Sequence, residues 1–520
     1  MVRERLIEAL QRYFGYPSFR PGQLEMIERV MAGKNVLGLL ATGGGKSITY
    51  QLPSLLLPGL VVVVSPLISL MMDQVQQLRS RRLISAAYLN SSLDPSEMKQ
   101  LMREIRQGKF KLVYVSPEKL QQPAVLQVLG ACGVSLLAVD EAHCISQWGH
   151  DFRTDYLRLP DAFAKLGDPP VLAVTATATQ AVREEICQLF GIHLDDVVMR
   201  PLNRRNIALD IIPVCSEAKR RERVLEAMED LQGPGIVYCG TRQAVDALVG
   251  HYQMTGRKRV HGYHGGMNGM ERALIQQQFL QDELDIIVAT NAFGMGIDKP
   301  DIRFVLHYHF PSSLEAYAQE IGRIGRDGKP GYAGMYYAQE DVHIHTHLLE
   351  KEYPTMEQAE IFLHRVCQGR LSYSDLMTNA NIGEELAQML MFYSEQAGLV
   401  SEVAATRDGL VCIPAPITQH SATIQDLWER TERAKKRKQQ KLRDMLQWVH
   451  SPDCLRAGLV RYYGETGETA FEKACCSRCG LDRRLYEQKR SAPVAQVKKD
   501  WDLEQALRSL LPKKMERGGR

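Results

Sequence analysis

The sequence predicts an α/β protein in which two tandem parallel-sheet lobes precede a helical, winged-helix-like segment and a small helical module with clustered cysteines. From about residue 30 to 340, short β-branched runs alternate with amphipathic stretches, the pattern of parallel sheets covered by helices on both faces. That span is too long for one such sheet, so we expect two lobes. Beyond residue 340 the strands largely stop, and four of the eleven cysteines fall in one short stretch.

The composition is that of an ordinary globular protein. The 520 residues are 45% hydrophobic and 24% charged, which excludes wholesale disorder, collagen-like repeats and an integral membrane bundle. The formal net charge is only +3, so local clusters must carry any affinity for nucleic acid. Residues 48–72 hold no charge, but Pro53, Pro58 and Pro66 interrupt them, which favours a buried strand over a membrane span. The N-terminus shows no apolar export signal, which predicts a cytoplasmic protein.

The first lobe is expected over residues 1–203 and the second over 204–345, with the crossing near residues 200–206. Each expected strand is a short apolar run, rich in β-branched residues, between helical stretches. The runs are 35–40, 60–64, 111–115, 135–140 and 171–176 in the first lobe, and 235–239, 285–290 and 304–308 in the second.

The chain changes character after residue 345. Residues 346–420 are expected to form three helices and a β-hairpin that turns at Asp408-Gly409, an order typical of a winged helix; a plain helical connector is the alternative. A long helix over 424–450 opens the next module, 421–482. Its residues 430–443 contain eight Lys and Arg against one acid, Glu432, so the helix either binds DNA or is a solvated face. The basic tail, 483–520, is expected to be partly disordered.

The strongest chemical signal is the segment Thr42-Gly43-Gly44-Gly45-Lys46-Ser47, which follows a buried strand and opens a helix. Consecutive glycines let backbone N–H groups turn toward one anion, and the helix N-terminus adds positive charge. Lys46 would reach the β- and γ-phosphates of a nucleotide, and the Ser47 hydroxyl would ligate Mg²⁺. Leu40 stands where the strict phosphate-loop pattern has its first glycine.

Such a loop needs an acidic pair at the end of another buried strand, and Asp140-Glu141-Ala142-His143 supplies it about ninety residues later. Asp140 would hold Mg²⁺ through water, and Glu141 would polarise the attacking water. In the second lobe Arg323 and Arg326 lie three residues apart, which predicts one face of a helix. Facing the γ-phosphate, either could act as an arginine finger, and the spacing does not say which; surface ion pairs are the alternative.

These residues resemble the RecQ family of superfamily 2 DNA helicases, over roughly residues 1–340 and again over 424–480. The resemblance implies that both lobes are RecA-like. The segments 14–16 and 19–23 are similar to the family's adenine-recognition motif. The match implies that Tyr16 stacks on the base, that Gln23 hydrogen-bonds its edge and that Arg20 packs nearby. Thr175-Ala176-Thr177 resembles the motif that links the ATP state to lobe closure.

The most specific match is Ser146-Gln147-Trp148-Gly149-His150-Asp151-Phe152-Arg153, which resembles the aromatic-rich loop of RecQ proteins. Trp148 and Phe152 can stack on unpaired bases, while Arg153 meets phosphate. A Trp–Phe pair in an unremarkable loop would more often belong to a core. Because this loop follows Glu141 closely, base occupancy would bias the ATP site.

RecQ proteins also carry four zinc-binding cysteines after a long helix, and the resemblance assigns Zn²⁺ to a closed set of four thiolates. Lys473 stands where the family pattern has a cysteine, and two of the present cysteines are adjacent instead, so His450 remains an alternative fourth ligand. Two further departures are that the winged-helix-like segment precedes the cysteines and that no room is left for the family's C-terminal HRDC domain. The expected zinc ligands are Cys454, Cys475, Cys476 and Cys479.

The resemblance implies an ATP- and Mg²⁺-dependent DNA helicase that moves 3′-to-5′ along single-stranded DNA and unwinds duplexes in recombination and repair. The expected partners are single-stranded DNA, forked duplex DNA and a single-stranded-DNA-binding protein. We expect a bacterial, nucleoid-associated monomer without membrane contact. The alternatives are a DEAH-type RNA helicase and a DNA-binding regulator with a vestigial ATPase; the presence of every phosphate-site residue argues against the second.

Overall fold

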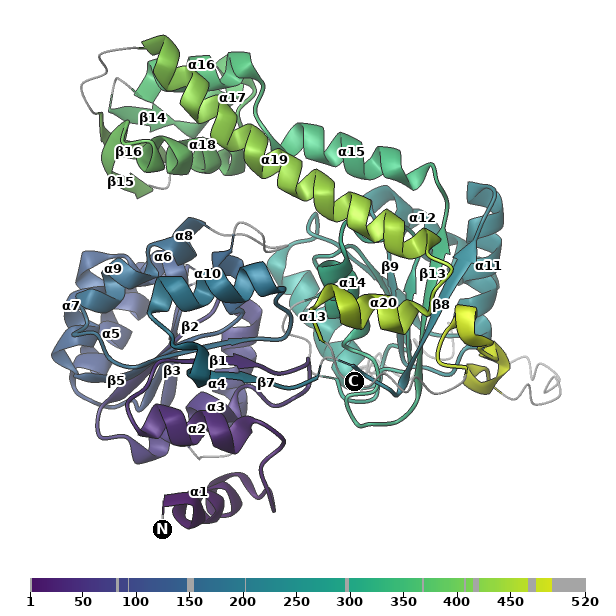
Figure 1. The fold of residues 1–520 in the computed structure, drawn as a ribbon, viewed down its shortest axis with the longest axis horizontal. Helices are drawn as coiled ribbons and strands as arrows, with labels where there is room; N and C mark the ends of the chain where they lie inside the picture. Colours follow the sequence, from purple (N-terminus) through teal and green to yellow (C-terminus); the bar gives the residue numbers. More distant parts are fainter. Residues whose placement is uncertain are drawn as a thin grey trace, which may run out of the picture.

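The computed structural model describes residues 2–80, 84–91, 93–146, 154–201, 203–294, 299–366, 369–405, 408–414, 420–465 and 474–488. Figure 1 shows two α/β lobes side by side, with a smaller body above the first lobe. One long helix, α19 (His420–His450), runs from that body down to the second lobe. The fold class expected from the sequence is confirmed.

Lobe 1 is built on a seven-stranded sheet in which every pairing is parallel, in the order β3-β4-β2-β5-β6-β1-β7. The central strands are fully buried because helices cover both faces, as their continuous apolar runs predict. The strands are β1 (Val36–Leu39), β2 (Leu60–Val64), β3 (Ala86–Leu89), β4 (Leu112–Val115), β5 (Val134–Val139), β6 (Val171–Thr175) and β7 (Val197–Met199).

Helix α5 starts where the sequence supplies its cap. Asp94 accepts hydrogen bonds from the backbone N–H groups of Ser96 and Glu97, and the Glu97 side chain reaches back, which forms a capping box with Pro95 at the first position. The helices are α1 (Val2–Ala9), α2 (Gln23–Met31), α3 (Ile48–Leu56), α4 (Ile68–Ser80), α5 (Pro95–Arg106), α6 (Pro117–Leu120), α7 (Pro123–Ala131), α8 (Thr154–Leu157), α9 (Leu159–Ala164) and α10 (Gln180–Phe190), with single turns η1 (Leu10–Phe14), η2 (Ala142–Ile145) and η3 (Leu194–Asp196).

Lobe 2 repeats the plan with a six-stranded parallel sheet in the order β10-β11-β9-β12-β13-β8. Residues 200–206 cross from β7 of lobe 1 to β8 of lobe 2. The strands are β8 (Ile207–Pro213), β9 (Gly235–Tyr238), β10 (Val260–Tyr263), β11 (Ile286–Ala289), β12 (Phe304–His307) and β13 (Gly331–Tyr337), and the helices are α11 (Glu217–Asp230), α12 (Arg242–Thr255), α13 (Gly269–Leu280), α14 (Leu314–Ile321) and α15 (Asp341–Glu352).

The smaller body has the helix and strand order of a winged helix. A three-stranded antiparallel sheet, β14-β16-β15, packs with three helices around its own apolar core. The elements are α16 (Met356–Val366), β14 (Arg370–Ser372), α17 (Tyr373–Ala380), α18 (Glu384–Gln396), β15 (Val400–Ala405) and β16 (Gly409–Pro414).

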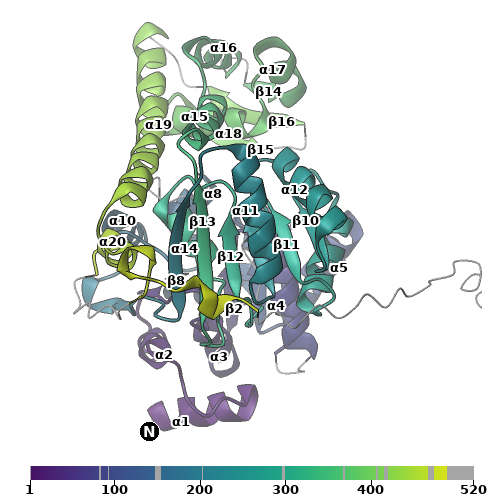
Figure 2. The same cartoon turned by 90° about the vertical axis from the view of Figure 1, so that its right-hand side faces the viewer.

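Helix α19 belongs to two cores. Leu427 and Ala434 pack into the core of the smaller body, whereas Met445 and Trp448 pack into that of lobe 2. Figure 2 shows α19 as one rod with α20 (Leu455–Tyr462) at its lower end. The turns η4 (Ser477–Cys479) and η5 (Arg483–Tyr486) follow. In the part of the chain that the structure describes, no helix is long and apolar enough to cross a membrane.

Candidate functional site

The phosphate loop lies between β1 and α3, as the sequence predicts. Gly43 and Gly45 adopt left-handed backbone angles, φ 81° and 76°, which side-chain-bearing residues rarely adopt. The Gln23 amide nitrogen donates to the carbonyls of Gly44 and Gly45, at 3.1 and 2.8 Å, and the Arg20 guanidinium donates to the Gly43 carbonyl. Arg20 and the first residue of α2, Gln23, therefore hold the loop by its backbone carbonyls.

The acidic pair follows β5, close to the phosphate loop. Lys46 Nζ lies 3.5 Å from Glu141 Oε1, and both side chains are largely buried. Burial, with the neighbouring charge of Glu141, raises the pKa of Asp140 to about 6, while the cation of Lys46 opposes that shift. The strand order places β6 between β5 and β1, so the carboxyl ends of these strands meet at one edge of the sheet.

His143 connects the acidic pair to strand β6, the neighbour of β5 in the sheet. The sequence contained His143 within its acidic motif but did not reveal this role. The buried His143 Nδ1 lies 2.9 Å from Thr175 Oγ1 and 3.4 Å from Glu141 Oε2. Thr175 ends β6 and opens the Thr175-Ala176-Thr177 segment. The site thus contains a polar path from the carboxylate of Glu141 to that segment.

The prediction that Arg323 and Arg326 share a helix face is wrong. Helix α14 ends at Ile321, and both arginines lie in the turns that follow, where Gly325 has a left-handed φ of 52°. Arg326 lines the cleft of the phosphate loop, and a Cβ on Gly43 would lie 2.9 Å from its Cγ. Arg323 is buried inside lobe 2, where burial raises the pKa of Tyr238 to about 12 and the cation of Arg323 opposes that rise.

One open cleft of about 610 Å³ gathers most of the predicted nucleotide-site residues. This volume lies within the roughly 300–1,000 Å³ of an ordinary small-molecule pocket. Tyr16 is 44% exposed, which leaves its ring free for stacking. The predicted residues that line the cleft are Tyr16, Arg20, Gln23, Thr42, Gly43, Gly45, Lys46, Ser47, Asp140, Glu141 and Arg326, and Gly44 lies within the same loop.

The donor set fits a nucleotide with a divalent cation. Glycine-rich backbone and Lys46 suit phosphate oxygens, whereas the Ser47 hydroxyl and the Asp140 carboxylate are the hard oxygen ligands that Mg²⁺ prefers. Trp148, Phe152 and Arg153, predicted to contact DNA, lie outside the described residues.

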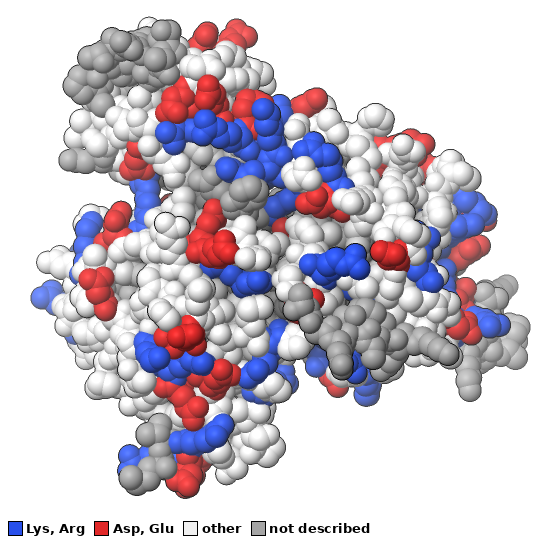
Figure 3. All heavy atoms as spheres, in the orientation of Figure 1, with Lys and Arg blue, Asp and Glu red and all other residues white. Residues whose placement is uncertain are grey.

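The basic stretch of α19 is largely engaged with acidic side chains. Figure 3 shows Lys and Arg gathered over α19 with Asp and Glu beside them. Lys441 Nζ lies 2.7 Å from Glu315 in a buried pair, and Lys438 pairs with Glu352 of α15. Lys436 is exposed and has no ion pair among the described residues. Lys438 and Lys441 therefore tie α19 to neighbouring helices, whereas the other ion pairs of this stretch lie within α19 itself.

The four cysteines come together at one edge of lobe 2. Their Sγ atoms all lie within 4.8 Å of one another. The backbone N–H of Leu209 in β8 donates to the Cys475 carbonyl at 3.2 Å, so the cluster lies against the edge strand of the sheet. Ala474 has a left-handed φ of 70°, directly before the two adjacent cysteines.

The spacing of the sulfur atoms fits a tetrahedral zinc site. Three of the Sγ–Sγ distances are 3.6, 3.9 and 3.5 Å. A tetrahedron with Zn–S bonds of about 2.3 Å has edges of about 3.8 Å. His450 instead packs edge-on against Tyr337, with ring centroids 5.2 Å apart. The geometry therefore favours Cys475 over His450 as the fourth ligand.

Two parallel α/β lobes that close on a phosphate loop, an acidic pair and a basic turn define a helicase-type ATPase. Comparison with known proteins agrees in each part of the chain. Residues 20–185 match the DEAD/DEAH box helicase family, residues 219–328 the helicase conserved C-terminal domain, and residues 415–482 the RecQ zinc-binding family.

The chain is 39% identical over 491 residues to "Probable ATP-dependent DNA helicase RecS" of Bacillus subtilis. That alignment covers 93% of this chain and 94% of the relative. It is 40% and 41% identical to proteins named ATP-dependent DNA helicase RecQ from Pasteurella multocida and Bacillus subtilis, over 69% and 66% of this chain. It spans only 56% and 58% of those two proteins. The chain belongs to the RecQ family of DNA helicases, as the sequence predicted.

Solved structures show the same fold. The Mycobacterium smegmatis helicase Lhr, bound to ssDNA and AMP-PNP, superposes with a TM-score of 0.54 at 17% identity, covering 78% of this chain and 60% of that one. The DUF1998 helicase MrfA bound to DNA gives 0.54 at 18% identity, covering 81% and 63%. The curated relatives do not favour an RNA helicase or a regulator.

Proposed function

We propose that this chain couples ATP hydrolysis to movement along single-stranded DNA, in the 3′-to-5′ direction, and thereby unwinds duplex DNA in recombination and repair. One observation carries the proposal. Lys46 and Glu141 of lobe 1 and Arg326 of lobe 2 line the same cleft, so a bound triphosphate would touch both lobes. Hydrolysis of that triphosphate can therefore change how strongly the two lobes are held together.

In the proposed mechanism, Ser47 and Asp140 would hold Mg²⁺, which would offset the negative charge of the β- and γ-phosphates. Lys46 binds the same phosphates, and Glu141 orients and polarises the attacking water. Arg326 donates to the oxygens on which charge develops, which makes it the better candidate for the arginine finger than Arg323. Its approach to Gly43 supports this assignment.

The DNA contacts are proposed from the residues that flank the acidic pair. A polar path runs from Glu141 through His143 to Thr175. Trp148, Phe152 and Arg153 follow it closely in sequence, so stacked bases would act on the same segment. We propose single-stranded and forked duplex DNA as substrates.

Zinc supplies no reacting group in this scheme. Four protein ligands leave no open coordination position, so a metal in the cysteine cluster would be structural.

We further propose that the protein acts as a monomer, because two lobes of one chain complete the cleft. A single-stranded-DNA-binding protein, which shares the same strand, is a proposed partner, and the bacterial nucleoid is the proposed location.

The experiment is an ATPase assay with and without single-stranded DNA, repeated with single-stranded RNA. We expect hydrolysis that DNA stimulates strongly and RNA does not. Trp148→Ala should keep basal hydrolysis but lose most of the stimulation, because one stacked base contributes about 1–3 kcal/mol of affinity. Equal stimulation by RNA, or none by DNA, would contradict the proposal.

A further inference from the structure

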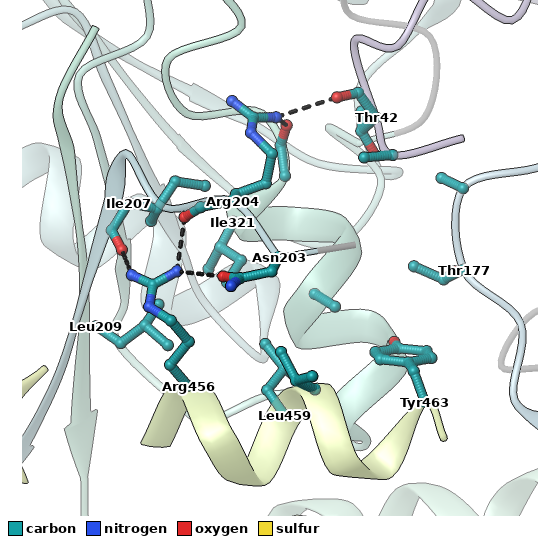
Figure 4. A pocket seen from close by; sticks show the side chains of 15 residues that line it. Thr42, Thr177, Asn203, Arg204, Ile207, Leu209, Ile321, Arg456, Leu459 and Tyr463 are labelled. Carbon is teal, nitrogen blue, oxygen red and sulfur yellow. Dashed lines mark hydrogen bonds between the residues drawn. The ribbon is translucent and has the colours of Figure 1, made fainter. Parts of the chain in front are cut away.

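Helix α20 of the cysteine module occupies the joint between the two lobes. Figure 4 shows a crevice there, with Leu459 and Tyr463 on one side and Thr177 of lobe 1 on another. Asn203 and Arg204, from the interlobe crossing, complete the lining together with Ile321 of lobe 2. Three parts of the chain that are distant in sequence therefore meet behind the ATP cleft.

Arg204 ties the phosphate loop to the turn that carries Arg326. Its guanidinium donates to the carbonyl of Thr42 at 3.1 Å and to that of Gly322 at 3.3 Å. It also donates to the carbonyls of Ile324 and Gly325, both at 2.7 Å. Burial and the nearby cation of Arg326 lower the pKa of Arg204. A single side chain thus fixes the backbone on both sides of the lobe boundary.

Arg456 of α20 hydrogen-bonds the backbone of Arg204. Its guanidinium donates to the Arg204 carbonyl at 2.7 Å and to the Asn203 side chain at 3.0 Å, and it also donates to the Ile207 carbonyl. Figure 4 shows these bonds converging on the crossing. Arg456 is buried and lies two residues after Cys454, one of the four clustered cysteines. Arg456 therefore connects the cysteine cluster directly to the interlobe crossing.

The other end of α20 is attached to lobe 1. Arg183 of α10 donates to the Tyr463 carbonyl at 3.2 Å and to the Ala178 carbonyl at 3.1 Å. Ala178 directly follows the Thr175-Ala176-Thr177 segment. Helix α20 consequently contacts the crossing at its start, and Arg183 links its end to the residue that follows the ATP-linked segment of lobe 1.

We propose that Arg204 is a positioning residue for Arg326 and that Arg456 makes this positioning depend on the cysteine module. The proposal deepens the regulation of the ATP site and rests on the proposed function. Arg204 fixes residues 322–325, whose backbone sets where the Arg326 side chain enters the cleft. Arg456 fixes the backbone of Arg204. A module outside the catalytic lobes thereby sets the rate of hydrolysis.

The consequence is a specific kinetic signature. Nucleotide binding relies on the phosphate loop and Tyr16, and Arg204 contacts that loop only at the Thr42 carbonyl. Arg204→Ala should therefore lower kcat about 10- to 100-fold, as misplacement of a transition-state contact does. The KM for ATP should change less than about threefold. Arg326→Ala should remove the group on which Arg204 acts, so adding Arg204→Ala to it should lower kcat little further.

The test measures kcat and KM for DNA-stimulated hydrolysis, affinity for a fluorescent ATP analogue, zinc content and the melting curve. Arg456→Ala and Arg456→Lys are both made, and the one that keeps one zinc and a cooperative melt is used. We expect its kcat to fall about tenfold with unchanged analogue affinity. Arg478→Ala is the matched control, because Arg478 belongs to the same module but donates to the Val449 carbonyl instead of the crossing.

A folded, zinc-containing Arg456 variant with wild-type kcat would overturn the role of the module. Independent, multiplying losses in the Arg204 and Arg326 variants would overturn the positioning role. A control variant that loses kcat as strongly as the Arg456 variant would reduce the effect to general packing and likewise contradict the proposal. These outcomes differ from a failure of the proposed function, in which the wild-type protein itself would lack DNA-stimulated hydrolysis.

Discussion

Arg323 and Arg326 are close in sequence but have different surroundings. Arg326 lines the cleft beside Gly43, whereas Arg323 is 3% exposed within lobe 2. We predict that Arg326→Ala lowers kcat about 10³-fold, the order expected for an arginine finger, and leaves the melting temperature nearly unchanged. Arg323→Ala should mainly lower the melting temperature, because it removes a buried side chain and leaves a cavity inside lobe 2. ATPase assays and calorimetry on both variants decide which arginine is the finger. A larger loss of kcat in the Arg323 variant than in the Arg326 variant would reverse this assignment.

His309 predicts how the stability of lobe 2 depends on pH. Burial first, and then the cation of Arg220, lower the pKa of His309 to about 3, and its Nδ1 accepts from the Gly240 N–H at 3.0 Å. The unfolded chain takes up a proton near pH 6.5, whereas the folded side chain stays neutral. The contribution of His309 is therefore complete above pH 6.5 and is lost as the pH falls toward 3, by up to about 1.4 kcal/mol per pH unit.

The matched variant is His309→Asn, whose side-chain oxygen can still accept from Gly240. We expect denaturant unfolding of the wild type to weaken more steeply from pH 7 to pH 5 than that of the variant. Identical pH dependence in the two proteins would show that His309 titrates normally in the fold.

At the scale of elements, the cysteine module is joined to lobe 2 more closely than the sequence suggested. Cys476 and Leu455 pack in the same apolar cluster as strands β8 and β12. We predict that Cys479→Ser lowers zinc below one per chain and increases proteolysis near residues 450–480, since zinc binding stabilises such modules by about 10–16 kcal/mol in peptides. The melting of lobe 2 should also shift. Metal analysis with limited proteolysis tests this.

The fourth ligand is tested by a second pair of variants. Cys475→Ala should lose zinc, whereas His450→Ala should keep it, because only the cysteine belongs to the cluster of sulfur atoms. Retention of zinc by the first variant and loss by the second would reverse the assignment.

Helix α19 contributes to stability as well as to charge. Lys441→Gln leaves Glu315 buried without its cation, and breaking such a pair costs about 3–5 kcal/mol. Lys436→Gln should leave stability unchanged and lower the salt slope of duplex binding by at most about 0.9, the contribution of one phosphate. Denaturant titration and binding at several salt concentrations separate the two effects. A destabilised Lys436 variant, or a stable Lys441 variant, would contradict this division.

At the scale of the whole molecule, local sequence was enough for most of the fold. All eight expected strands occur, because each is a continuous apolar run that only a buried strand accommodates. The strands that the sequence did not reveal include β3, β7, β8 and β10, which lie at sheet edges. Strand β13 was also missed: it reads GYAGMYY, with no β-branched residue, and finds its place through packing between β12 and β8.

The site was predictable where spacing alone carries the chemistry, as in the phosphate loop and the acidic pair. The arginine turn was not, since Gly322 and Gly325 end the helix where the charge spacing suggested that it continued. Arg204 and Arg456 gave no signal, because their partners are backbone carbonyls more than a hundred residues away. Contacts of that kind belong to the assembled lobes and leave no local pattern.

The most direct test of the central claim is strand displacement from a DNA duplex with a single-stranded 3′ tail, with ATP and Mg²⁺. We expect the wild type to release the strand, and a 5′-tailed duplex to remain paired. Glu141→Gln should bind the same DNA and nucleotide but release no strand, because it cannot polarise water. Release without ATP, equal release by the Glu141 variant, or no release from any tailed DNA by an active ATPase would contradict the account.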